Sequence, residues 1–112
     1  MAIDFESLDS LDRKRILLVD DDPFILGVLE KLLGLLGLET ILQAGDGEQA
    51  LALLKDTAVD LLITDVLMPN LDGLSLLKKI RSGQSSAAAS LPCIVVSSWM
   101  TRRPLQRLWR WM

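Results

Sequence analysis

Two short apolar segments that each end at an aspartate constrain the possible folds most strongly. Residues 16–19 read ILLV and run directly into the aspartates at 20–22, and residues 59–64 run into Asp65. Strands this short and this apolar are typical of parallel sheets that are buried on both faces. The carboxyl ends of parallel strands lie at one edge of the sheet, where such folds bind their ligands. We therefore expect Asp20, Asp21 and Asp65 to lie close together at that edge, together with Ser97, which follows the apolar run at residues 93–96.

Helical patterns separate these predicted strands. Asp22 followed by Pro23 predicts a helix start, because aspartate caps the first turn and proline suits the first helical position. Apolar residues then recur at helical spacing as far as Leu36, and Gly37 is a natural helix end. The same reading predicts strands at residues 16–19, 39–44, 59–64 and 93–96, and further helices at residues 48–55 and 74–81.

The alternation of strand and helix with short connections predicts an α/β fold, a doubly wound parallel sheet with helices on both faces. We assign residues 1–14 as a lead-in, residues 15–98 as one domain and residues 99–112 as an atypical tail rich in tryptophan and arginine. Helical spacing also identifies the side chains that we expect to face the sheet: Ile25, Val28, Leu29, Leu32, Leu33, Leu36, Ala50, Leu51, Leu54, Leu74, Leu77 and Ile80.

The composition removes several classes of function. The chain has no histidine and one cysteine, so imidazole-based catalysis, disulfides and cysteine-rich metal sites are excluded. Cys93 lies in the apolar run CIVV, which predicts a buried position. The net charge of −3 does not indicate binding to nucleic acid or to a membrane surface, and no apolar run approaches the roughly 18 residues of a membrane span. The charged N-terminus lacks an apolar signal segment, so we expect a cytoplasmic protein.

The predicted cluster of carboxylates favours a hard cation. Three carboxylates brought together would repel one another, and burial would favour their protonated forms. A divalent ion with oxygen ligands removes that conflict, and a site with few protein ligands and room for water suits Mg²⁺ better than Ca²⁺. A carboxylate is also a nucleophile that can form an aspartyl phosphate. Phosphoryl transfer to one of these aspartates is therefore the chemistry that the pattern favours.

Four segments of the chain, in order, resemble the receiver domain of response regulators. They are ILLVDDDPFI, AGDGEQAL, VDLLITDVLMPNLDG and PCIVVSS, and together they cover about residues 15–98. The resemblance implies the flavodoxin-like receiver fold, with strand order 2-1-3-4-5. It also implies two-component signalling, in which a histidine kinase or a phosphotransfer protein donates a phosphoryl group. Such a chain is a signalling domain rather than an enzyme, and no nucleic-acid or membrane partner is expected for it.

The resemblance assigns roles to individual residues. Asp65 is expected to be the phosphoacceptor, with Asp21 binding Mg²⁺ directly and Asp20 binding it mainly through water. The backbone carbonyl of Leu67 is expected to be a further metal ligand, and Ser97 the switch hydroxyl. The other aspartates are read as structural: Asp22 as a helix cap, Asp46 and Asp72 as turn residues, and Asp60 as an exposed charge.

After Ser98 the sequence departs from the family. The fifth strand and the fifth helix have no counterpart, nor does the lysine that binds the phosphoryl group. Residues 99–112 hold all three tryptophans and four arginines. We favour a shifted reading frame, since the codons of the tail read one base earlier resemble an ordinary fourth helix. The alternative is a cationic amphipathic segment for a membrane surface or partner helix, built on Leu105, Leu108, Trp109 and Met112.

Two other functions stay open at this point. One is a binding module that has lost phosphorylation together with the lysine. The other, more distant, is a phosphatase of the haloacid-dehalogenase type, which the pair Asp20 and Asp22 matches in part. A fourth strand without a fifth beside it would also be a sheet edge, so we expect the chain to self-associate through residues 92–112. The alternative is that the tryptophan-rich tail folds back over this edge and leaves a monomer.

Overall fold

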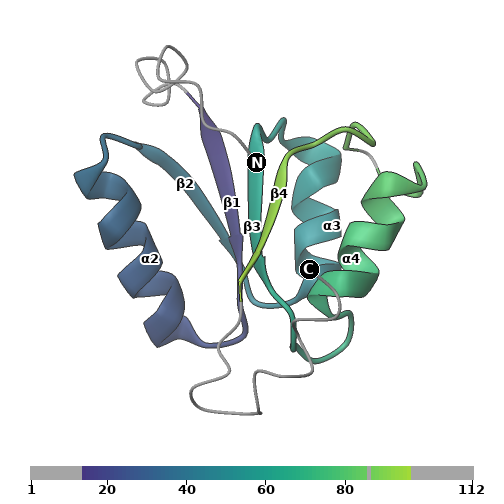
Figure 1. Cartoon of the computed structure of the whole chain (residues 1–112), viewed down its shortest axis with the longest axis horizontal. Coiled ribbons are helices and arrows are strands. Elements are labelled where there is room, and N and C mark those ends of the chain that lie inside the picture. The colour runs from purple at the N-terminus through teal and green to yellow at the C-terminus, as the bar shows by residue number, and fades with distance from the viewer. Residues whose placement is uncertain (1–13, 86, 97–112) are drawn as a thin grey trace.

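The structure is a computed structural model in which residues 14–85 and 87–96 are described. Short loops join strands and helices in strict alternation, as the sequence predicts (Figure 1). The elements are β1 (Arg15–Val19), α2 (Pro23–Leu35), β2 (Thr40–Ala44), α3 (Gly47–Asp56), β3 (Leu61–Asp65), α4 (Gly73–Arg81) and β4 (Cys93–Val96).

The strands form a parallel sheet in the order β2-β1-β3-β4. The register brings the last residues of neighbouring strands level with one another, since Val19 pairs with Ala44 and Asp65 pairs with Val96. This arrangement confirms the predicted α/β doubly wound fold of the flavodoxin-like receiver type over the described part of the chain. It also means that the residues following β1 and β3 lie at one edge of the sheet.

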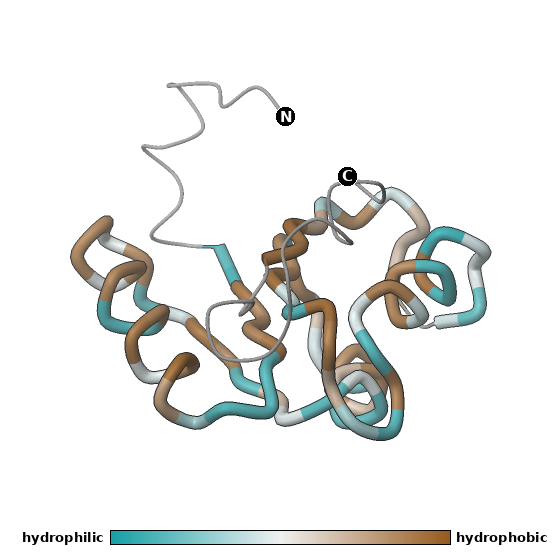
Figure 2. The backbone as a smooth tube through the Cα atoms, turned by 60° about the horizontal axis from the view of Figure 1, so that its bottom comes forward, coloured by the Kyte–Doolittle hydropathy of each residue, from teal (hydrophilic) through white to brown (hydrophobic). Residues whose placement is uncertain are grey.

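Helices cover both faces of the sheet (Figure 1). On one face, α2 packs over a cluster that includes Leu18, Leu26 and Ile63. On the other face, α3 and α4 pack over a larger cluster that includes Leu17, Leu54 and Leu76. Figure 2 shows hydrophobic residues along the strands and along much of α2. The central strand β1 is buried from both sides, because Ile16, Leu17, Leu18 and Val19 are each at most 1% exposed.

The helix α2 begins and ends where the sequence predicts, but its buried face is different. Asp22 caps it and Pro23 is its first residue, while Gly37 has a φ of +92° just past the end. Leu26, which the spacing did not select, is its one buried residue, and Leu29 and Leu33 pack beside it. The expectation was wrong for three other residues, because Val28, Leu32 and Leu36 are exposed. Nearly every face of this helix carries a leucine, isoleucine or valine, so periodicity alone could not select the stripe that meets the sheet.

In α4 the most deeply buried residues are Leu76 and Ile80, whereas Leu74 and Leu77 are only partly buried. The prediction was thus right for Ile80 and missed Leu76. For α3 it was right, since Ala50 and Leu54 belong to the core and Leu51 packs against it. Within the described ranges, no helix has the length and apolar character needed to span a bilayer.

Candidate functional site

The carboxylates that follow β1 and β3 converge at the carboxyl edge of the sheet. Asp20, Asp21 and Asp65 each offer an oxygen atom, and these oxygens all lie within 4.8 Å of one another. Asp20 and Asp65 are buried, with exposed fractions of 2% and 1%, while Asp21 is intermediate. The local cause is that Asp20 and Asp65 stand at the ends of apolar strands whose last residues are buried, so these strands carry the two carboxylates into the interior.

Asp65 is held by hydrogen bonds from its two neighbours in the chain, Thr64 and Val66. One of its carboxylate oxygens, Oδ1, accepts a hydrogen bond of 2.8 Å from the backbone N–H of Val66. Its carbonyl oxygen accepts a bond of 3.0 Å from the hydroxyl of Thr64, which is itself fully buried. These bonds restrict the rotamer of the carboxylate and the position of the strand end. The roles predicted for Asp65, phosphoacceptor and metal ligand, would require this kind of preorganisation.

Asp20 and Asp22 have different roles although they are neighbours. Oδ1 of Asp20 accepts a hydrogen bond of 2.9 Å from the backbone N–H of Asp22. The side chain of Asp22 instead accepts a bond of 2.9 Å from the backbone N–H of Phe24, as an N-cap of α2 does. Asp22 is therefore a helix cap, as predicted. A haloacid-dehalogenase site would use Asp20 and Asp22 together, and the carboxylate cluster joins Asp20 to Asp21 and Asp65 instead.

The two remaining predicted site residues are Leu67 and Ser97. Leu67 lies in the loop of residues 66–72, two residues after Asp65. The backbone N–H of Gly73 donates a 2.9 Å bond to the carbonyl of Val66, which closes this loop. Ser97, the predicted switch hydroxyl, follows directly after β4 and lies outside the described residues.

Sequence reasoning missed part of the role of Asp46. It was read as a turn residue, and it is in fact the N-cap of α3, with a 2.8 Å bond from the backbone N–H of Gln49. Its second oxygen accepts a bond of 2.7 Å from the side-chain amide of Asn70, in the loop after Asp65. The bond from Gln49, followed by that from Asn70, holds the pKa of the Asp46 carboxyl below its usual value. No signal within either segment could have indicated this pairing across 24 positions.

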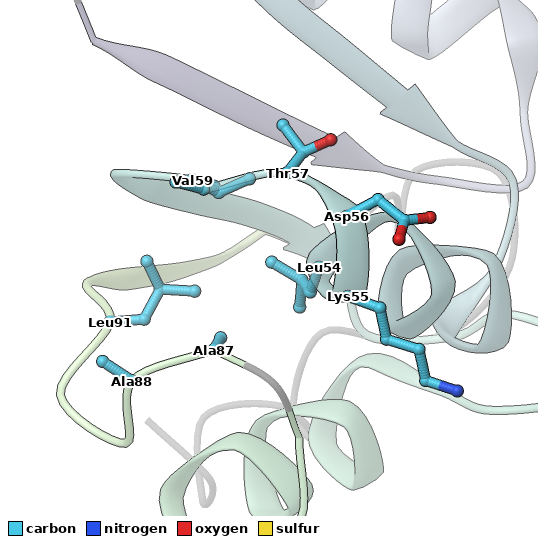
Figure 3. A pocket seen from close by; sticks show the side chains of 9 residues that line it. Leu54, Lys55, Asp56, Thr57, Val59, Ala87, Ala88 and Leu91 are labelled. Carbon is cyan, nitrogen blue, oxygen red and sulfur yellow. The ribbon is translucent and has the colours of Figure 1, made fainter.

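A pocket at the opposite end of the sheet has few side chains that could bind a ligand or react. It lies beside the residues that precede β3 and β4 and has a volume of about 360 Å³. Figure 3 shows Leu54, Val59, Ala87 and Leu91 around it, while the side chain of Lys55 extends away from these residues. Its lining is mostly small and apolar. The convergent carboxylates at the carboxyl edge are therefore the stronger candidate site.

The chemistry of the carboxylate cluster fits a divalent cation. Two of its three acids are buried, and their negative charges repel at separations below 4.8 Å. Carboxylate oxygens are the ligands that Mg²⁺ prefers, and three of them leave positions free for water and for a phosphoryl oxygen. The cluster lies at the topological position where doubly wound sheets bind ligands.

A comparison with known families agrees with this geometry. The family model described as the response regulator receiver domain matches residues 16–109. The chain belongs to this family. It is a receiver domain of the type used in two-component signalling. Receiver domains are signalling domains and are generally not enzymes. The matched range extends past residue 98, the last position of the motifs that carried the resemblance in the sequence.

Relatives of this receiver domain occur in several kinds of protein. The chain is 42% identical over 89 residues to the gliding motility regulatory protein of Myxococcus xanthus. It is 52% identical over 67 residues to the transcriptional regulatory protein CpxR of Klebsiella pneumoniae. These matches cover 77% and 60% of the chain but 11% and 28% of the two relatives. The chain thus spans only a small part of the curated relatives that it matches.

Solved receiver domains share the fold. The receiver domain of a Francisella response regulator superposes with a TM-score of 0.68 and 30% identity, over 80% of this chain and 69% of that one. A response regulator receiver protein from Pseudomonas putida gives a TM-score of 0.68 at 32% identity, over 75% and 67% of the two chains. These likenesses support the receiver fold independently of the motifs.

Proposed function

We propose that this receiver domain accepts a phosphoryl group on Asp65, with Mg²⁺ held by Asp20, Asp21, Asp65 and the backbone carbonyl of Leu67. The convergence of three carboxylate oxygens within 4.8 Å at the carboxyl edge of the sheet carries this proposal. Asp65 stands at the end of β3, between the acidic pair and the loop that contains Leu67. Among the three acids, it is the one to which the resemblance to receiver domains assigns the phosphoacceptor role.

The proposed step is the transfer of a phosphoryl group from a phosphohistidine. A carboxylate oxygen of Asp65 forms a bond to phosphorus while the bond from phosphorus to the imidazole nitrogen breaks. The electron pair of that bond stays on the imidazole, whose other ring nitrogen carries a proton, so the ring leaves as neutral imidazole. The products are an acyl phosphate on Asp65 and a neutral histidine on the donor.

The groups around Asp65, from backbone and side chains, would orient the atoms that react. The bond from the Val66 N–H to Oδ1 fixes one carboxylate oxygen. Bound Mg²⁺ would supply neutralisation of the charge on the transferring phosphoryl group. Ser97, directly after β4, is proposed to donate a hydrogen bond to a phosphoryl oxygen. Asp20 and Asp21 would hold the cation and would not react.

The proposed donor is a histidine kinase or a phosphotransfer protein. The chain itself has no histidine, so it cannot supply the phosphohistidine. One relative is named the sensor histidine kinase RcsC of Salmonella typhimurium, 42% identical over 76 residues, which amount to 68% of this chain and 8% of that protein. We propose a cytoplasmic protein without a nucleic-acid or membrane partner of its own.

The proposal is tested by intact mass after exposure to a small phosphodonor with Mg²⁺. We expect the mass of one phosphate to be added to the wild-type chain and none to be added to Asp65→Asn. Asp56→Asn, an exposed aspartate at the end of α3, is the matched control and should accept phosphate normally. Phosphate on the Asp65→Asn protein would overturn the assignment.

A receiver-like binding module that is not phosphorylated is the second candidate. It is favoured by one feature of the given sequence: residues 82–112 contain no lysine that could bind the phosphoryl group. The same experiment separates the two functions. A folded wild-type chain that binds Mg²⁺ and gains no phosphate would favour the binding module.

We also propose that the chain self-associates through β4. Among the described residues, β4 pairs with β3 alone and is the last strand of the sheet. An edge strand presents a row of backbone donors and acceptors that a second strand can pair with. Ile94 in this strand is 40% exposed, as an apolar contact with a second copy would require. Leu32 and Leu35 of α2, which are 52% and 84% exposed, are further large apolar side chains on the surface.

A further inference from the structure

The carboxylate of Asp46 connects two segments of the site that are distant in sequence. One oxygen caps α3 by accepting from the backbone N–H of Gln49, at 2.8 Å. The other accepts from the side-chain amide of Asn70, at 2.7 Å. The residue is only 6% exposed. Because both oxygens are engaged and the side chain is buried, the carboxylate is fixed in orientation and ties α3 to the loop that follows Asp65.

Asn70 has an unusual backbone at the point where it is held. Its φ of 66° makes it the one non-glycine residue with a positive φ in the described ranges. Asparagine tolerates this left-handed conformation better than most residues. The backbone N–H of Leu71 donates a 2.8 Å bond to the carbonyl of Pro69, which closes a three-residue turn centred on Asn70. The hydrogen bond to Asp46 thus acts on the residue that reverses the loop.

A backbone contact lies beside this side-chain bond. The N–H of Gly47 donates to the carbonyl of Leu71, at 3.0 Å. A Cβ atom built on Gly47 would approach that carbonyl oxygen to 2.5 Å, so the approach is close enough to require glycine. The start of α3 therefore contacts the loop twice, through Asn70 and through Leu71.

These contacts bear on the geometry of the carboxylate site. The loop of residues 66–72 contains neither helix nor strand, and it carries Leu67, whose carbonyl is a proposed metal ligand. Its ends are held by Asp65 and by the bond from Gly73 to Val66. The middle of the loop is held by the start of α3, through the contacts of Asn70 and Leu71. A backbone oxygen can serve as a ligand only if the loop that bears it is held in one conformation.

We propose that Asp46 and Asn70 are positioning residues for the phosphoacceptor site. Their hydrogen bond, which we call the Asp46–Asn70 latch, holds the loop after Asp65 in the conformation that binds the cation. Neither residue belongs to the carboxylate cluster, so both act through the loop. This inference rests on the proposed function of Asp65 and adds that cation affinity depends on a contact with α3.

The test uses variants that break the latch and little else. Asp46→Ser keeps a hydroxyl that can cap α3 but removes the oxygen that Asn70 contacts. Asn70→Gly removes the amide and keeps the left-handed backbone accessible, so it is the variant least expected to disturb folding. For the full-length chain, Mg²⁺ affinity and the rate of phosphorylation at saturating Mg²⁺ are measured. We expect each variant to bind Mg²⁺ roughly tenfold more weakly, the usual effect of losing an outer-shell contact.

Two comparisons separate positioning from a general loss of stability. The double variant should bind Mg²⁺ no more weakly than the weaker single variant, because both changes break the same bond. Asn70→Asp places two carboxylates face to face and should bind Mg²⁺ most weakly. Adding Asp46→Asn to it exchanges donor and acceptor, which should restore much of the affinity. Rescue by this exchange would not follow from stability alone.

The inference is overturned if Asp46→Ser and Asn70→Gly bind Mg²⁺ as the wild type does, or if their losses are additive. It is also overturned if the exchanged pair is no better than Asn70→Asp. Failure of the proposed function looks different: the wild-type chain itself would gain no phosphate, or its Mg²⁺ affinity would not change in Asp65→Asn.

Discussion

Gly73, the first residue of α4, lies directly against the carbonyl group of Asp65. A Cβ atom built on Gly73 would overlap the Asp65 carbonyl oxygen and would also press on the hydroxyl of Thr64. The N–H of Gly73 meanwhile donates to the carbonyl of Val66, at 2.9 Å. The start of a helix thus packs on the strand end that carries the predicted phosphoacceptor, and only a residue without a side chain fits between them.

Gly73→Ala should therefore damage both stability and the site. The added methyl group must displace α4 or the end of β3, which we expect to lower the free energy of unfolding by roughly 1–3 kcal/mol, as overpacking commonly does. Denaturant unfolding measures this loss. Mg²⁺ affinity should fall as well, since the backbone of Asp65 moves. Gly34→Ala is the matched control, because no atom lies within 4 Å of the added methyl group. Its unfolding midpoint should come at a denaturant concentration at least as high as that of the wild type.

Asp21 and Asp22 should differ sharply in their effect on Mg²⁺ binding. Asp21→Asn removes a charged oxygen from the carboxylate cluster, and we expect the affinity to fall roughly tenfold or more. Asp22→Asn keeps a side chain that caps α2 well, so affinity should change little. Isothermal titration of the two variants checks the difference. Equal losses would contradict the separation of ligand from helix cap.

The Asp46 carboxylate should make stability depend on pH in the acid range. Its folded pKa is lowered, mainly by the bond from Gln49 and then by that from Asn70, so folding favours the ionised form. The resulting stability is present above the ordinary pKa of 3.8 and is lost as the pH falls through the lowered value. Denaturant unfolding at pH 7, 4 and 3 of the wild type and Asp46→Ser should show their difference shrinking with acidity. A difference that stays constant would contradict this account.

Cys93 should react slowly with alkylating reagents. Burial raises the pKa of its thiol, and the nearby Arg81 opposes that rise only in part. At pH 8 less of the reactive thiolate is present than in an unhindered thiol. We expect the folded chain to be alkylated by iodoacetamide more slowly than the same chain in denaturant. Comparable rates, followed by mass spectrometry, would show that the thiol is freely accessible.

Self-association through β4 should respond to a charge on its exposed side chain. Ile94→Lys places an ammonium group on the exposed edge strand, which disfavours strand pairing between copies. Light scattering should show a larger species for the wild type and a shift toward monomer for this variant. Lys55→Glu, which changes the charge of an exposed residue on α3, is the control. A wild-type chain that is monomeric at high concentration, and remains so when residues 99–112 are deleted, would end the proposal.

The sequence by itself determined the order of the elements and the place of the acidic residues. The ends of β1 and β3 could be read because each is a short apolar run stopped by aspartate, and a parallel sheet brings such ends to one edge. Asp22 could be assigned as a cap since capping is a local contact with Phe24, two residues away. These conclusions depend only on periodicity and on neighbours in the chain.

Tertiary structure alone decided which apolar side chains of α2 are buried and which loops touch. The stripe of α2 that faces the sheet contains Leu26 rather than Leu32, because the angle at which one helix packs on a sheet is not encoded in its own period. The contact of Asp46 with Asn70 joins residues 24 positions apart. It exists only where α3 and the loop after Asp65 are both in place on the sheet. Contacts of this kind depend on the position of whole elements, and no local pattern in the chain specifies that position.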